Sequence, residues 1–141
     1  MDLSTEQIRK ILTDKGLKIT HQRLSILNAI YTLNNHPTAD NTIEYIRESH
    51  PNIATGTVYK VLDTLVENKV IKKVKTDRDI MRYDGIIENH HHLYCSECDL
   101  IEDYIDKELD ELLKEYFKKK KFTGFKIEDI VVQIRGTFDK C

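Results

Sequence analysis

The sequence lacks the features that mark a membrane or secreted protein. No apolar run approaches the roughly 20 residues that a membrane-spanning helix requires. The N-terminus has no basic segment followed by an apolar stretch, so we expect no signal peptide. The three cysteines are an odd number, which argues against a framework of paired disulfides. These absences predict a cytoplasmic protein that makes no membrane contact.

A strong charge of either sign is also absent. The 141 residues carry 22 Lys and Arg against 24 Asp and Glu, and this net charge of −2 does not fit a basic nucleic-acid coat protein. The charge is unevenly distributed: residues 1–84 hold 13 basic and 11 acidic side chains, whereas residues 85–141 hold 9 and 13. The length leaves no room for a large enzyme scaffold. We therefore expect two small modules, residues 1–84 and residues 85–141, with different partners.

Residues 4–68 are predicted to form four helices. Three of them follow a side chain that can accept a hydrogen bond from the first turn. These candidate caps are Ser4, Thr20 and Thr38. The fourth helix covers residues 55–68 and repeats its apolar residues on one face. Two short apolar segments at 70–74 and 80–83 then flank a polar turn at 76–79, which is typical of a hairpin. This order of elements predicts a winged helix-turn-helix.

The fourth helix carries its polar side chains in its N-terminal part. In a recognition helix, the N-terminal residues are the ones that contact base edges. The candidate DNA-contacting residues there are Thr55, Gly56, Thr57, Tyr59 and Lys60. Hydroxyl and lysine side chains can bind phosphates or base acceptors, and a tyrosine ring can pack against a thymine methyl. The hairpin adds cations that could neutralise phosphates, namely Lys72, Lys73, Lys75, Arg78 and Arg82. A solvated charged face and a protein-interaction module are the alternatives to DNA binding.

Beyond Gly85 the pattern becomes that of a small α/β domain. Residues 90–95 and 100–105 are predicted strands on either side of a turn. Residues 106–121 are a predicted helix with one apolar face, and residues 126–134 are a predicted strand rich in Ile and Val. The predicted fold class is therefore α+β, with an N-terminal winged helix-turn-helix followed by a small α/β domain.

Three consecutive histidines lie at the start of the first of these strands. Because alternate side chains of a strand share a face, His90 and His92 point one way, and His91 and Cys95 point the other. This arrangement implies two separate sites, with His91 outside the histidine site. Two imidazoles need oxygen partners to hold Fe²⁺ or Mn²⁺. The further candidate ligands are Asp84, Asp103 and His36. The alternative to metal binding is an exposed polar strand end.

Cys95 and Cys98 have the C-x-x-C spacing of half a tetrahedral zinc site, which needs two more ligands. Cys141 is the remaining thiol. A catalytic dithiol of the thioredoxin type would place its cysteines at the start of a helix, whereas a strand is predicted after Cys98. The spacing therefore favours metal binding over redox catalysis.

Three segments of the chain resemble the ferric uptake regulator (Fur) family of metal-dependent bacterial repressors. Residues 18–23, Lys-Ile-Thr-His-Gln-Arg, resemble the family's K-x-T-x-Q-R segment, with His21 where proline is common. Residues 57–62, Thr-Val-Tyr-Lys-Val-Leu, resemble its T-V-Y-[RK]-x-L recognition helix. Residues 90–98 resemble its H-x-H-x-x-C-x-x-C signature. The resemblance covers nearly the whole chain.

This resemblance implies a homodimer that binds a palindromic double-stranded DNA operator, with Arg23 among the DNA-contacting residues. The second module would carry dimerisation and metal binding. The regulatory Fe²⁺ or Mn²⁺ would be bound by three histidines and two carboxylates, which by position are His36, Asp84, His90, His92 and Asp103. The resemblance implies no enzyme activity and no small-molecule ligand other than metal and peroxide.

Asp103 bears on the subtype within the family. Peroxide-sensing, PerR-like members resemble this chain in having aspartate there, whereas iron-sensing members usually have glutamate. The resemblance therefore favours peroxide sensing, with oxidation at His36 or His90. A Fur-type regulator of iron or zinc uptake is the alternative in the same class. A metalloenzyme and a metal-storage module are alternatives from other classes.

The chain departs from the family at its second C-x-x-C, where residues 138–141 read Phe-Asp-Lys-Cys. Phe138 stands in place of the third cysteine. A Zn²⁺ site formed by Cys95, Cys98 and Cys141 with an outside fourth ligand remains open, and so does an empty cysteine site. No histidine follows His92, although a further metal site in some Fur proteins uses a C-terminal histidine.

Overall fold

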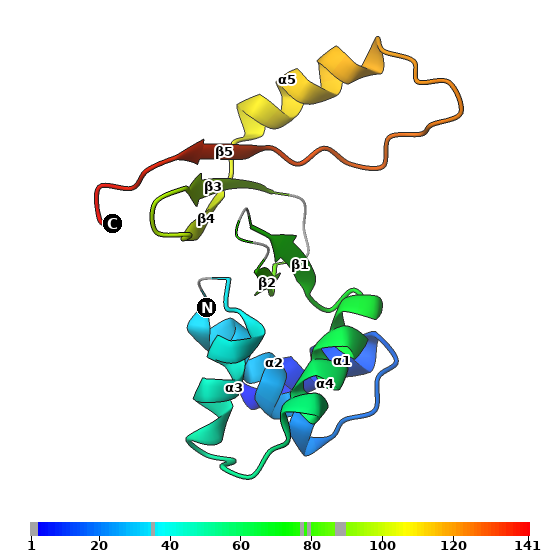
Figure 1. Ribbon diagram of the computed structural model, residues 1–141. Helices are drawn as coiled ribbons and strands as arrows, with labels where there is room; N and C mark the ends of the chain where they lie inside the picture. Colours follow the sequence, from blue (N-terminus) through cyan, green and yellow to red (C-terminus); the bar gives the residue numbers. More distant parts are fainter. Residues whose placement is uncertain (1–2, 35, 77, 79, 87–89) are drawn as a thin grey trace. The chain divides into compact units, whose positions relative to one another are not determined.

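The computed structural model describes residues 3–34, 36–76, 78, 80–86 and 90–141. The chain folds into two compact units, Met1–Ile87 and Glu88–Cys141, and each is described by itself (Figure 1). Their elements confirm the predicted α+β class, because four helices and a hairpin in the first unit are followed by a small sheet and one helix in the second. None of the helices in the described ranges is long and apolar enough to cross a membrane.

The first unit contains α1 (Thr5–Asp14), α2 (His21–Leu33), α3 (Ala39–Arg47) and α4 (Thr55–Glu67). The three predicted caps are confirmed: the side chains of Ser4, Thr20 and Thr38 accept hydrogen bonds from backbone N–H groups of α1, α2 and α3. Such caps satisfy N–H groups that have no partner within the helix, and each stabilises a helix by about 1 kcal/mol. Residue 54, before α4, provides no side-chain cap.

The core of this unit is formed where the four helices pack together. Its fully buried side chains recur at helical spacing, and they include Leu12 of α1, Ile26 and Leu27 of α2, and Leu62 and Leu65 of α4. The predicted buried face of the fourth helix is therefore confirmed. The polar residues at the start of α4 lie outside this core and remain available for binding.

A two-stranded hairpin follows α4. Strands β1 (Lys72–Lys75) and β2 (Met81–Asp84) are antiparallel, and Lys72 pairs with Asp84. The predicted first strand began too early, because Val70 and Ile71 are buried in the helical core and precede β1. Residues 77 and 79 of the predicted turn lie outside the described residues.

The segment before α3 lies alongside β2. The backbone N–H of Tyr83 donates to the carbonyl of Pro37 (2.9 Å), and Arg82 Nη1 donates to the carbonyl of His36 (2.9 Å). An isolated bridge joins Thr38 to Arg82. These contacts hold the loop after α2 against the end of the hairpin. Arg82, which was predicted to neutralise DNA phosphates, also supports the His36 loop in the structure.

The second unit contains β3 (His91–Cys95), β4 (Ile101–Tyr104), α5 (Lys107–Lys118) and β5 (Gln133–Gly136). The three strands form one sheet in the order β4-β3-β5, with β4 antiparallel and β5 parallel to β3. A long connection leads from the end of α5 back to β5 (Figure 1). Because β3 is the central strand, its histidines have β4 on one side and β5 on the other.

The predicted strand at 126–134 is wrong over most of its length, because pairing begins only at Gln133. Within the described residues, no strand pairs with positions 126–132, so their high β-propensity has no ladder to join there. Ile127 and Ile130 instead line a pocket of about 580 Å³ with Leu113 and Phe117 of α5. No residue of α5 is fully buried within the chain.

Candidate functional site

The first unit brings two of the predicted metal ligands together. His36 Nε2 lies 3.3 Å from Asp84 Oδ2, and both side chains are buried. His36 has a φ of 58°, a left-handed conformation that histidine adopts more readily than most residues. Asp84 is the last residue of β2, and its other oxygen accepts a hydrogen bond from the N–H of Ile86 (2.9 Å). The hairpin and the α2–α3 loop thus place an imidazole beside a carboxylate.

Gly85 and Tyr31 support this pair from the side of α2. A Cβ atom on Gly85 would lie 2.6 Å from a ring carbon of Tyr31, so only glycine fits against the ring without movement. The Tyr31 hydroxyl donates to the Gly85 carbonyl at 3.4 Å. Burial raises the pKa of Tyr31, and the Asp84 carboxylate raises it further. The hydroxyl therefore stays protonated and acts as a donor beside Asp84.

The second unit brings the other three predicted ligands together. His92 on β3 lies directly opposite Asp103 on β4, and His90 precedes β3 on the same face. Asp103 Oδ1 lies 2.8 Å from His90 Nε2 and 3.8 Å from His92 Nε2. The two imidazole rings have their centroids 4.6 Å apart. Two nitrogen donors and one oxygen donor therefore converge within one small volume, which is a suitable set for Fe²⁺ or Mn²⁺.

His91 lies on the opposite face of β3, as predicted, and the structure shows its partners. The N–H of Val132 donates to His91 Nδ1 (3.0 Å), so this nitrogen carries no proton. Nε2 then carries the proton and donates to Asp110 Oδ1 of α5 at 2.6 Å. The His91 side chain is 2% exposed. Its two hydrogen bonds connect β3 to α5 and to the segment before β5.

The three cysteines also meet in the second unit. Their sulfur atoms all lie within 4.8 Å of one another. Cys98 and Cys141 form a disulfide with a Cα–Cα distance of 5.9 Å, and Cys95 Sγ lies 3.2 Å from Cys141 Sγ. The sequence predicted this grouping as a candidate zinc site but did not predict the disulfide.

The turn between β3 and β4 directs a backbone N–H group at the Cys95 thiol. Asp99 has a φ of 62°, and its carboxylate accepts a hydrogen bond from the Tyr94 hydroxyl at 2.6 Å. The N–H of Cys98 points at Cys95 Sγ, 3.4 Å away. Burial raises the pKa of the Cys95 thiol, but backbone N–H groups of Cys98, Phe138 and Glu97 lower it, and the net pKa is below the ordinary value. Such N–H···S contacts favour the thiolate that a metal ligand requires.

The predicted DNA-contacting residues of α4 lie on the surface of the first unit. Thr55 and Gly56 are exposed, Lys60 is exposed, and Tyr59 is 43% exposed. Nothing lies within 4 Å of the position that a Gly56 Cβ would take, so the fold does not require glycine there. The half-buried Thr57 completes this polar helix start. The surface is therefore open to a ligand that approaches the helix backbone closely.

The other predicted DNA-contacting residues lie near the start of α2 and on the hairpin. Arg23 Nη1 donates to the carbonyl of Lys18 at 2.7 Å, which holds its guanidinium near the N-terminal end of α2. Lys73 lies 3.9 Å from Asp63 of α4, and both side chains are about half exposed. An exposed pair of this kind contributes little to stability. Lys72 is half-buried on β1.

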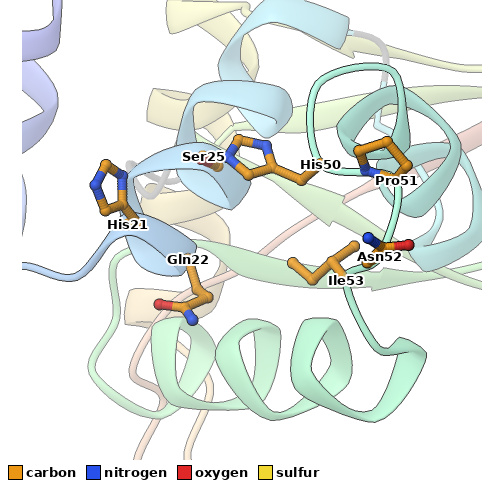
Figure 2. Close-up of a pocket in the computed structure, with 7 residues that line it drawn as sticks. All are labelled: His21, Gln22, Ser25, His50, Pro51, Asn52 and Ile53. Atoms are coloured by element: carbon orange, nitrogen blue, oxygen red, sulfur yellow. The ribbon is translucent and has the colours of Figure 1, made fainter.

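Figure 2 shows a pocket of about 320 Å³ between the start of α2 and the turn that follows α3. His21 and His50 line it, and both are exposed, as predicted. His50 Nδ1 lies 3.0 Å from the Ser49 hydroxyl. This pocket is separate from the predicted metal ligands of the first unit, which belong to the loop after α2 and the end of β2.

Sequence reasoning missed several residues that support the sites. The Arg82 contact to the His36 loop, the fit of Gly85 against Tyr31, and the ion pair between Lys140 and Glu102 all join residues far apart in sequence. No local pattern marks such pairs. The His91–Asp110 contact had a partial signal, because the strand alternation already placed His91 on the face opposite to the other histidines.

Comparisons with known proteins agree with these observations. Residues 14–135 match the ferric uptake regulator family. The chain is 30% identical over 149 aligned positions to the ferric uptake regulation protein of Bacillus subtilis strain 168, covering 100% of this chain and 96% of the relative. It is also 30% identical over 130 positions to the peroxide operon regulator of the same organism, covering 92% of this chain and 88% of the relative.

The fold is similar to that of the Helicobacter pylori ferric uptake regulator Fur, a protein with three functional metal-binding sites. The TM-score is 0.80 at 23% sequence identity, covering 99% of this chain and 95% of the other. Proteins of the family bind DNA operators and form dimers, and metal ions at His/Asp and Cys sites are typical of them. The chain therefore belongs to the ferric uptake regulator family, whose members are metal-dependent transcriptional regulators and not enzymes.

Proposed function

We propose that the protein is a homodimeric repressor that responds to peroxide through a regulatory Fe²⁺ or Mn²⁺ and binds a palindromic operator in the cytoplasm. The observation that carries this proposal is the position of Asp103 on β4 beside both His92 on β3 and His90, which precedes β3. Asp103 is the residue whose type resembles the peroxide-sensing members of the family. Its short carboxylate is already placed against two imidazoles.

In this proposal one ion is held by ligands from both units. His36 and Asp84 provide one nitrogen and one oxygen from the first unit, whereas His90, His92 and Asp103 provide two nitrogens and one oxygen from the second. Neither set alone offers the four or more ligands that a divalent transition ion commonly takes. Together they form a mixed nitrogen and oxygen set that suits Fe²⁺ and Mn²⁺.

Binding through both sets would link metal occupancy to DNA affinity. An ion bound by both units favours conformations in which the two sets approach each other, and it shifts the population toward them. Two winged helices of a dimer must match the spacing of two half-sites on DNA. We infer that the metal-bound population has this spacing. The exposed residues Thr55, Gly56, Tyr59 and Lys60 of α4 would then reach base edges, while Lys72, Lys73 and Arg23 contact phosphates.

When bound, Fe²⁺ supplies the redox chemistry by which peroxide oxidises a ligand side chain. His36 and His90 are the proposed targets, since each lies beside a carboxylate and is buried from competing solutes. An oxygen atom added to either ring weakens it as a ligand. Loss of one of the five ligands lowers metal affinity, and the repressor then leaves its operator.

The dimer and the cysteine site complete the proposal. Apolar side chains of the second unit remain exposed in the single chain, and they include Ile105, Leu112, Tyr116 and Ile134. A second copy covering this surface would explain why α5 has an apolar face but no buried residue. We further propose that Cys95, Cys98 and Cys141 bind Zn²⁺, which is supported by their convergence and by the N–H group aimed at Cys95.

A Fur-type regulator of iron or zinc uptake is the second candidate. The full-length similarity to the Bacillus subtilis ferric uptake regulation protein favours it as much as the similarity to the peroxide operon regulator favours the first. Both candidates share the metal ligands and the DNA surface. They differ in whether peroxide modifies the Fe²⁺-loaded protein.

Operator binding with and without metal tests the shared part of the proposal. In gel-shift assays with operator DNA, Mn²⁺ should strengthen binding by the wild-type protein and not by His92→Ala. His50→Ala is the matched control, because it removes an exposed histidine outside the proposed ligand set and should keep the metal response. An unchanged Mn²⁺ response in His92→Ala would contradict the assigned ligands. Peroxide added to the Fe²⁺-loaded complex should release DNA if the peroxide proposal is correct.

A further inference from the structure

The cysteine cluster can support two chemistries that exclude each other. Three sulfur atoms within 4.8 Å of one another can act together as metal ligands. The same atoms can instead form one disulfide, Cys98–Cys141, with the Cys95 thiol 3.2 Å from one of its sulfurs. A metal ligand must be a thiolate, and a disulfide sulfur is not one. Formation of the disulfide therefore removes two of the three sulfur ligands.

The segment that carries Cys141 is held near the turn by contacts that involve no sulfur. The N–H of Ser96 donates to the Gly136 carbonyl at 3.0 Å. Lys140 pairs with Glu102 of β4, and its ammonium lies 5.0 Å from the centre of the Phe138 ring. These contacts are independent of the oxidation state of the cysteines. We therefore expect these contacts to keep Cys141 near Cys98 when the two cysteines are reduced.

The site is open at one coordination position. A closed structural zinc site has four protein ligands, but this cluster contains three cysteines. Among the described residues, no further His, Cys, Asp or Glu belongs to the cluster. Phe138 lies in the same C-terminal segment and has no group that could bind metal. A zinc ion held by the three cysteines would need a fourth ligand from outside the cluster, and an exchangeable ligand such as water would give small molecules access to the thiolates.

The exposure of the three cysteines ranks their access to an oxidant. Cys141 is exposed, Cys98 is half-buried and Cys95 is buried. Oxidants attack accessible thiolates first, and the resulting sulfenic acid condenses with a neighbouring thiol. Cys141 is therefore the first target, and Cys98 is the thiol that reacts with it.

We propose that this cluster is a switch that exchanges Zn²⁺ for the Cys98–Cys141 disulfide, an inference that rests on the proposed zinc site. In the first step the Cys141 thiolate attacks hydrogen peroxide, the O–O bond breaks, and hydroxide leaves. In the second step the Cys98 thiolate attacks the Cys141 sulfur, the S–S bond forms, and the second oxygen leaves as hydroxide. The two sulfurs lose two electrons in total, peroxide gains them, and two protons from solvent convert both hydroxides to water. Zn²⁺, left with Cys95 as its one sulfur ligand, dissociates.

Zinc release and disulfide mapping on the reduced, zinc-loaded full-length protein test this exchange. Zinc content is measured in the wild type and in Cys98→Ser, and the difference between the two is taken as the cysteine-bound zinc. One equivalent of hydrogen peroxide is added, released zinc is followed with a chromogenic chelator, and free thiols are alkylated. Cleavage after glutamate places the three cysteines on separate peptides, residues 89–97, 98–102 and 129–141. Peptide masses then identify which cysteines are linked.

We expect one cysteine-bound zinc per chain, its complete release, a link between peptides 98–102 and 129–141, and an alkylated Cys95. Cys95→Ser and Cys141→Ser form a matched pair, because each removes one sulfur ligand. Cys95→Ser should still form the link, whereas Cys141→Ser should lack it and lose zinc to peroxide severalfold more slowly than the wild type.

Three results would overturn the exchange: no cysteine-dependent zinc in the reduced protein, zinc retained after the disulfide has formed, or release accompanied by a different link. Mn²⁺-dependent operator binding by the same reduced sample tests the repressor function separately. If that binding fails while zinc still exchanges for the disulfide, the repressor proposal is wrong and the switch stands.

Discussion

Asp103 lies opposite His92 in the β3–β4 pair, and its Oδ1 is 2.8 Å from Nε2 of His90. One short carboxylate thus contacts the histidine across the strands and the one that precedes β3. The antiparallel register of β3 and β4 places Asp103 directly opposite His92. Any change in the length of residue 103 must therefore alter the oxygen position relative to both imidazoles.

Asp103→Glu should separate metal binding from peroxide reactivity. The longer side chain can still bind a metal, so Mn²⁺-dependent operator binding should persist. The shifted oxygen should slow oxidation of His36 and His90 by roughly ten- to a hundredfold, as expected for a displacement of about 1 Å near a reacting centre. Peptide mass spectrometry of Fe²⁺-loaded protein after peroxide measures the added oxygen. Equal oxidation in the variant and the wild type, or none in either, would contradict the peroxide-sensing proposal.

Gly85→Ala should destabilise the first unit. The new Cβ would meet the Tyr31 ring at 2.6 Å, and forcing extra atoms into a packed site costs about 1 to 3 kcal/mol. Urea unfolding followed by circular dichroism measures the loss. Gly56→Ala is the matched control, because its Cβ would enter open space and should leave the free energy of unfolding nearly unchanged or slightly raised. A similar loss in both variants would show that the Tyr31 contact is not the cause.

Gly56→Ala serves a second purpose at the DNA surface. The start of α4 is exposed, and glycine there allows DNA to approach the helix backbone. The variant should therefore fold normally yet bind operator DNA more weakly, by about 1 to 3 kcal/mol if it disturbs one base contact. Fluorescence anisotropy with Mn²⁺ present gives the affinity. Wild-type affinity in this variant would show that DNA does not contact α4 at Gly56.

The cap of α5 should make the second unit sensitive to acid. The Tyr104 hydroxyl donates to Asp106 Oδ2 at 2.5 Å and the N–H of Leu109 donates to Oδ1 at 3.0 Å, and both bonds lower the pKa of Asp106. Because the folded-state pKa lies below the unfolded one, this stabilisation is present above the unfolded pKa of about 4 and is lost as pH falls through the folded pKa.

Asp106→Asn keeps a helix-capping side chain but removes this titration. The difference in the free energy of unfolding between wild type and Asp106→Asn should therefore shrink as pH is lowered from 6 to 3, measured by urea unfolding at each pH. Tyr104→Phe, which removes the hydroxyl donor, should reduce the same pH dependence. A difference that does not change with pH would contradict the assigned bonds.

Local rules recovered much of the fold from the sequence. The caps at Ser4, Thr20 and Thr38 and the buried face of α4 depend on residues within a few positions of each other, and the structure confirms them. Strand alternation also placed His91 on the face opposite to His90 and His92. What failed depends on distant partners. In the part of the chain that the structure describes, the Ile- and Val-rich segment before Gln133 pairs with no strand, so its high β-propensity did not produce a strand.

In the functional sites, too, local patterns were predictable from the sequence and contacts between distant residues were not. The sequence offered the three cysteines as a candidate zinc site and left an empty site open, but the Cys98–Cys141 bond required knowing how the segment after β5 returns to the turn at 95–98. The support of His36 by Arg82 was equally hidden, because a cation in a basic hairpin is expected to face DNA. Long-range hydrogen bonds decide such assignments, and a single sequence does not encode them in any local pattern.

A crystal structure of the Mn²⁺-loaded protein, with anomalous scattering data collected at the manganese edge, tests the central claim most directly. The account predicts one anomalous peak coordinated by His36 and Asp84 of the first unit together with His90, His92 and Asp103 of the second. A manganese peak bound by one set alone, or located away from both, would contradict the claim that a single ion joins the two units.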